Sequence, residues 1–81
     1  MNLFLSSQTE RKEVEALHKC TLHELSGLIA LFKKLETENL HSLAKADESA
    51  RIYRLQGRVE VLTDFLEAVE KAASVLERTR P

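Results

Sequence analysis

The chain divides into two long stretches in which apolar residues recur at the spacing of an α-helix. In the second stretch, from Ile52 to Leu76, steps of three and four residues alternate, which is the heptad pattern of a helix that packs along another helix. The apolar residues of this heptad seam are Ile52, Leu55, Val59, Leu62, Leu66, Val69, Ala73 and Leu76. The pattern predicts a helix over about residues 48–78 with a helical neighbour.

The first stretch carries a wider apolar face. Its apolar residues are Val14, Leu17, Leu25, Leu28, Ile29, Phe32, Leu35, Leu40 and Leu43. Projected on a helix, they span roughly 160°. The run Ser7-Gln8-Thr9-Glu10 fits a capping box at a helix start. We therefore expect one long helix over about residues 8–44, preceded by an N-terminal arm of residues 1–6.

A polar interruption over Lys45-Ala46-Asp47-Glu48 separates the two stretches. Asp47 could cap a second helix there, with Glu48 in the first turn of that helix. Because no Gly or Pro marks the interruption, one continuous helix and a break near Thr37–Asn39 both stay open. The favoured fold is all-α: a single domain over residues 1–81, folded as an antiparallel helical hairpin.

The second helix has more apolar surface than its seam. A neighbouring row holds Val61, Phe65, Ala68, Ala72 and Val75. One helix cannot cover both rows, so we expect the second row to stay open and two hairpins to pair as a homodimeric four-helix bundle. A parallel two-stranded coiled coil is the rival arrangement, although its facing e and g positions would form no ion pair. The residues predicted to serve self-association are Leu25, Phe32, Ile52, Leu55, Val59, Leu62, Leu66, Val69 and Leu76.

Composition fits this picture. The chain has 81 residues, a charged fraction of 31% and a net charge of −1. This size is near the limit at which one chain buries enough apolar surface to fold alone, which again favours self-association. No apolar run reaches the ~20 residues that span a bilayer, and the first residues lack the features of a signal peptide. We expect no membrane association and a cytoplasmic location, which the single cysteine fits.

The sequence offers no catalytic or cofactor-binding pattern. His18, Cys20 and His23 would point in different directions on a helix, so they cannot share one metal ion. No glycine-rich phosphate loop or glycine-framed nucleophile occurs. We therefore expect no enzyme activity, no cofactor and no metal.

The most unusual local feature is a row of arginines. Arg51, Arg54 and Arg58 lie within about 60° of one another on a helix, in the row that continues as Val61 and Phe65. In one interpretation they pair with acids of the first helix, because a turn near Ala46 brings Arg54 level with Glu38. In the other, they dock an acidic protein surface or a phosphate.

Arginine and tyrosine are enriched at the energetic centres of protein interfaces, and Tyr53 lies within the arginine run. The predicted partner-binding residues are therefore Arg51, Tyr53, Arg54, Arg58, Val61 and Phe65. Two alternatives stay open. One is a nucleic-acid-binding accessory protein that adds Lys33 and Lys34 to the arginines, which the near-neutral net charge disfavours. The other is a structural assembly component that only self-associates.

The run Ile52-Tyr53-Arg54-Leu55-Gln56-Gly57-Arg58-Val59, followed by Leu62 and Phe65-Leu66, resembles a segment of small uncharacterised proteins encoded by tailed bacteriophages. The resemblance covers residues 52–66. It implies an accessory or virion-associated protein that binds and modulates a host or viral complex in the host cytoplasm. At the other end of the chain, we expect the apolar triplet Leu3-Phe4-Leu5 to fold back on the end of the bundle or to serve a partner as a short plug.

Overall fold

The structure, a computed structural model, describes residues 2–78. These residues form helices and no β-strand, and the predicted all-α class is confirmed. The elements in order are α1 (Arg11–Lys19), a short 3-10 helix (His23–Leu25), α2 (Ser26–Lys45) and α3 (Ser49–Arg78). The described chain thus has three α-helices where the sequence predicts two.

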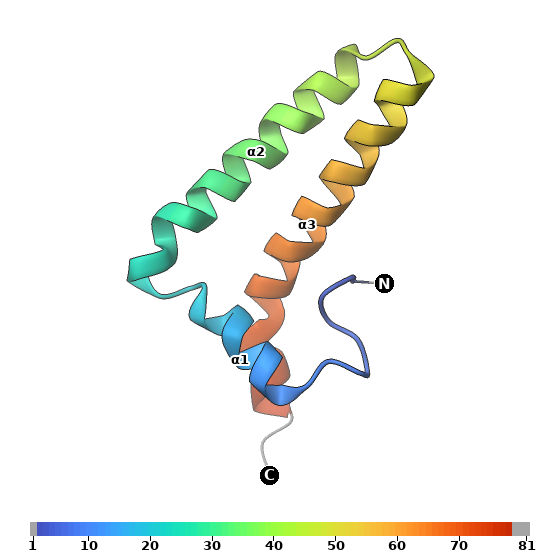
Figure 1. Cartoon of the computed structure of the whole chain (residues 1–81). Helices are drawn as coiled ribbons and strands as arrows, with labels where there is room; N and C mark the ends of the chain where they lie inside the picture. Colours follow the sequence, from blue (N-terminus) through green and yellow to red (C-terminus); the bar gives the residue numbers. More distant parts are fainter. Residues whose placement is uncertain (1, 79–81) are drawn as a thin grey trace.

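The helices α2 and α3 lie side by side and run in opposite directions (Figure 1). Residues 46–48 connect them, so the predicted interruption at Lys45–Glu48 is confirmed. The carbonyl of Glu48 accepts a hydrogen bond from the backbone N–H of Ile52 at 2.9 Å. The helix α3 begins at Ser49, one residue later than a cap at Asp47 predicts.

The predicted single helix over residues 8–44 is wrong, because the chain leaves the helical path between Lys19 and Ser26. Leu22 has extended backbone, with φ −68° and ψ 151°. The carbonyl of His18 accepts hydrogen bonds from the backbone N–H of Thr21 at 3.0 Å and from its hydroxyl at 2.7 Å. These local bonds replace the bonds that a continuing helix would supply. The break lets α1 change direction and pack against the C-terminal half of α3 (Figure 1).

The start of α1 also differs from its prediction. The helix begins at Arg11, whereas the sequence places the start near Gln8. The backbone N–H of Glu10 donates to Oε1 of Glu13 at 2.9 Å. This is the reciprocal bond of a capping box, so the motif is present but lies three residues further along the chain than predicted.

The residues before α1 form an arm that packs on α3. The ring of Phe4 meets the ring of Phe65 edge to face, with 5.5 Å between centroids and 76° between planes. Phe65 also meets Phe32 of α2 at 5.2 Å and 65°. The apolar triplet thus folds back at Phe4, but its contact lies on the side of α3 and not at the predicted end of the bundle. One aromatic cluster joins the arm, α2 and α3.

Asp64 fixes the beginning of the arm to α3. Its carboxylate Oδ2 accepts a hydrogen bond from the backbone N–H of Leu3 at 2.9 Å. Its backbone carbonyl accepts a second bond, from the side-chain amide of Asn2 at 2.8 Å. Asn2 Oδ1 in turn accepts from the backbone N–H of Phe4 at 2.8 Å. The arm is thus held by polar contacts as well as by its aromatic ring.

The core is small because the helices form a single layer. The Cα positions extend over 51 × 28 × 14 Å. The buried residues are Val14, Leu55, Leu66, Ala68, Val69 and Ala72, and no large side chain among the described residues is completely enclosed. A single layer leaves outward-facing apolar side chains without a covering helix.

The expected division between a covered seam and an open second row is only partly correct. Ala68 and Ala72 of the second row are completely buried, since α1 packs on this half of α3. Val61 is 48% exposed, so the row is open only before Phe65. Among the residues predicted to serve self-association, three are buried within one chain and the others are half-buried. The buried ones are Leu55, Leu66 and Val69, and the half-buried ones are Leu25, Phe32, Ile52, Val59, Leu62 and Leu76.

Candidate functional site

A polar groove between α2 and α3, near their connection, contains all three arginines of the predicted site. Its volume is about 400 Å³, and its lining residues are Glu38, Asn39, Ser42, Arg51, Arg54, Leu55 and Arg58. We call it the arginine groove. Leu55, which is 6% exposed, is its buried apolar component. The helical spacing of the arginines places three cations along one wall, whereas the opposite wall on α2 contributes an amide, a hydroxyl and one carboxylate.

Within residues 2–78, none of the three arginines forms an ion pair with a carboxylate. All ion pairs found within residues 2–78 join other residues, and none includes Arg51, Arg54 or Arg58. The expected register of Arg54 and Glu38 is present, since both line the groove. The expected salt bridge between them is absent. An exposed pair of this kind gains little from forming, because solvent screens it and both side chains lose rotamer freedom. The groove therefore holds three arginines and one carboxylate, and no ion pair joins them in the described part of the chain.

An apolar groove continues directly from the arginine groove. Its volume is about 680 Å³, and its lining residues are Leu35, Asn39, Arg54, Gly57, Arg58, Val61 and Leu62. Asn39, Arg54 and Arg58 belong to both grooves. The side-chain amide of Asn39 donates to the carbonyl of Leu35 at 2.6 Å, which fixes its position at the junction. One continuous surface thus combines positive charge with exposed apolar area.

The six predicted partner-binding residues do not all lie on this surface. The three arginines and Val61 line it. Tyr53 is 73% exposed and lines neither groove. Phe65 is half-buried between Phe4 and Phe32. The sequence thus places the arginines and Val61 together correctly, but Tyr53 lies apart and Phe65 already contacts the arm.

The α2 wall of the site, with Asn39 and Ser42, is not among the residues predicted from the sequence. Asn39 and Ser42 follow Leu35 at helical spacing on one face of α2, so this face changes from apolar to polar toward the connection. On α3, the row that holds Val61 changes to arginine toward the same connection. These matched changes from apolar to polar residues on both helices are the sequence signal that could have identified the α2 wall of the site.

A row of exposed leucines approaches the apolar groove along α2. Leu28 is 43% exposed and Leu31 is 49% exposed. Steps of three and four residues place both on the face that holds Leu35. We call Leu28, Leu31 and Leu35 the leucine face. Within the described part of the chain, Leu28 and Leu31 are far more exposed than the core residues, whose exposed fractions are 8% or less.

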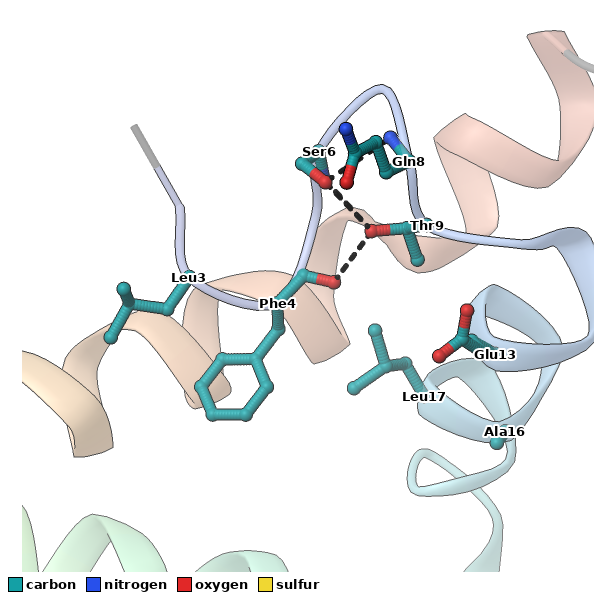
Figure 2. Close-up of a pocket in the computed structure, with 8 residues that line it drawn as sticks. All are labelled: Leu3, Phe4, Ser6, Gln8, Thr9, Glu13, Ala16 and Leu17. Carbon is teal, nitrogen blue, oxygen red and sulfur yellow. Dashed lines mark hydrogen bonds between the residues drawn. The ribbon is translucent and has the colours of Figure 1, made fainter.

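A separate hollow of about 450 Å³ lies between the arm and α1 (Figure 2). Figure 2 shows Phe4 and Leu17 extending toward it from opposite sides. The hydroxyl of Thr9 forms hydrogen bonds with Ser6 and with the carbonyl of Phe4, to which it donates at 3.2 Å. Glu13 is the only charged lining residue, and its carboxylate already caps α1. This hollow therefore offers a ligand few free polar groups.

The remaining candidate residues are dispersed. Lys33, which the nucleic-acid alternative adds to the arginines, lines a different hollow together with Cys20. His18 and Cys20 are half-buried and His23 is exposed. No group of three His, Cys, Asp or Glu residues in the described chain could hold a metal ion. None of the helices within residues 2–78 has both the length and the apolar character needed to cross a bilayer.

No family model, no curated protein and no solved structure matches this chain.

Proposed function

We propose that this chain is a non-enzymatic interaction protein that self-associates through the leucine face. The observation that carries the proposal is the exposed area. A compact monomer of 9.2 kDa exposes about 4,900 Å², whereas this chain exposes 6132 Å². The excess of about 1,200 Å² is larger than the ~800 Å² that each partner buries in a standard interface. A second copy is a natural occupant for surface of this extent.

The leucine face is the best-suited contact for that second copy. Leu28 and Leu31 are outward-facing on a single layer of helices, and apolar side chains of this kind gain free energy when a second layer covers them. Two α2–α3 pairs stacked through this face would form the four-helix arrangement that the sequence predicts. The resemblance to small bacteriophage proteins extends the proposal: such a dimer would act by binding a host or viral complex.

A pair of matched variants tests the interface. Leu31 and Leu40 are both on α2 and are 49% and 47% exposed, but nine residues of helix place them on opposite faces. In sedimentation equilibrium at micromolar concentration, we expect a dimer for the unmodified chain and for Leu40→Lys, and a monomer for Leu31→Lys. Circular dichroism should show that both variants keep their helix content. A monomeric unmodified chain would contradict the proposal, and a dimer of Leu31→Lys would exclude the leucine face.

A further inference from the structure

We propose that the arginine groove and the adjoining apolar groove together bind an acidic amphipathic helix of a partner protein. This site adjoins the self-association face, since Leu35 belongs to both, whereas its charged part contains no residue of the leucine face. The two grooves share Asn39, Arg54 and Arg58, so one ligand can occupy both. The ligand must then carry carboxylates at one end of its contact and an apolar side chain at the other.

Charge complementarity identifies the polar half of the ligand. Arg54 and Arg58 are one helical turn apart and repel each other unless an anion lies between them. No carboxylate of the described chain fills that role. Arginine binds a carboxylate through two parallel hydrogen bonds, so each unpaired guanidinium is a specific receptor for Asp or Glu. The hydroxyl of Ser42 on the opposite wall can also donate a hydrogen bond to a ligand carboxylate.

The apolar groove identifies the other half. Leu35, Val61 and Leu62 provide apolar contact area. At Gly57 between them, an added Cβ would meet no atom of the chain within 4 Å, so a ligand can approach the α3 backbone closely. From Arg51 to Val61 the surface runs for about 15 Å along α3. That length accommodates roughly three turns of a helix, whose rows of side chains recur at the matching spacing.

Nucleic acid fits this surface less well. A polyanion binds by charge along an extended basic track, but here the basic stretch ends in an apolar groove and includes the carboxylate of Glu38. Lys33 lies in another hollow, and the chain as a whole has a net charge of −1. A protein ligand that offers a few carboxylates beside an apolar side chain uses both grooves.

Fluorescence anisotropy with matched probes tests the proposal. The probes are labelled amphipathic helical peptides with a Leu row beside a row of Glu, Gln or Lys, and a single-stranded and a duplex oligonucleotide. The protein variants are Arg54→Glu and, as a control with the same charge change on an exposed position of α2 outside both grooves, Lys34→Glu. Circular dichroism and sedimentation of each variant report folding and self-association separately from binding.

We expect the Glu peptide to bind at least tenfold more tightly than the Gln and Lys peptides. Arg54→Glu should weaken its binding at least tenfold with helix content and oligomeric state unchanged, and Lys34→Glu should change it less than twofold. Glu38→Gln should tighten binding, because it removes the competing carboxylate from the groove. The proposal is overturned if the Glu peptide does not bind, if the Gln peptide binds equally well, if Arg54→Glu has no effect, or if an oligonucleotide binds more tightly.

Discussion

At the scale of single residues, the arginines of α3 show how a helix can hold charges that its own chain does not neutralise. Like charges one turn apart cost about 0.2–0.5 kcal/mol, which solvent exposure of Arg51, Arg54 and Arg58 keeps small. Across residues 2–78, no ion pair supplies a counter-charge for them. Their guanidinium groups stay available to a carboxylate from another molecule, and their rigid forked geometry favours a planar anion over a point charge.

Gly57 gives a prediction at the same scale. It lies inside α3, where glycine costs about 1 kcal/mol relative to alanine, and no atom of the chain would contact an added Cβ within 4 Å. We expect Gly57→Ala to stabilise the isolated protein by up to about 1 kcal/mol, which raises the melting temperature by roughly 4–8 °C. Thermal unfolding followed by circular dichroism measures this shift.

Gly27→Ala is the control for that prediction. Gly27 also has open space around it, but it is the second residue of α2, where helix propensity counts for less than in the interior. Its substitution should give a smaller gain. A Gly57→Ala protein that melts at a lower temperature would mean that a second molecule contacts the α3 backbone at this position.

At the scale of elements, the N-terminal arm is a separate structural unit. Phe4 is half-buried against Phe65, and an aromatic pair contributes about 0.5–1.5 kcal/mol beyond its area. We expect Phe4→Ala to lower the free energy of unfolding by about 2 kcal/mol and to raise amide hydrogen exchange over residues 2–9. Leu3→Ala should have little effect on either measurement, because Leu3 is 60% exposed. Equal effects of the two variants would show that the ring contact does not hold the arm.

The break between α1 and α2 shows what periodicity cannot predict. Leu17 and Leu25 are eight residues apart, so they share a face in any continuous helix and the pattern runs across the break without a change of phase. The structure breaks there because Thr21 satisfies the end of α1 through its backbone and hydroxyl. The break also lets α1 pack on α3, where Val14 is buried. The Thr21 bonds are local but leave no trace in the apolar pattern, and the packing of α1 on α3 depends on tertiary position.

The α2–α3 connection and the arginine row could be predicted because both depend on the local sequence pattern. A run of polar residues at Lys45–Glu48 interrupts the apolar pattern, and helical spacing alone places Arg51, Arg54 and Arg58 together. Whether Arg54 pairs with Glu38 could not be predicted, because it depends on side-chain positions that differ by a few ångströms. The position of Phe65 depends on the arm, whose path no periodic pattern describes.

At the scale of the whole molecule, the single layer of helices sets the shape. The radius of gyration is 14.7 Å, whereas a compact domain of 81 residues has about 12 Å. A flat, elongated chain with a small core gains much of its stability from whatever covers its faces. Stability and assembly should therefore be coupled in this protein.

This coupling is measurable as a dependence of melting temperature on concentration. If the folded state is a dimer, each tenfold increase in protein concentration should raise the melting temperature by roughly 3–6 °C, because mass action favours the associated form. Scanning calorimetry over two decades of concentration tests this. Leu31→Lys should remove the dependence. A melting temperature that is independent of concentration for the unmodified chain would show that the monomer is stable alone.

The docking of the arm on Asp64 also has a consequence for the order in which the parts of the protein can fold. The bond from Asn2 to Asp64 spans 62 positions of the chain, and α1 likewise packs on the last helix. On the ribosome, the arm and α1 emerge before α3 and must therefore wait for it, while the α2–α3 pair forms from neighbouring segments. Phe4 and the α1 helix therefore lack their α3 contacts until that helix has emerged.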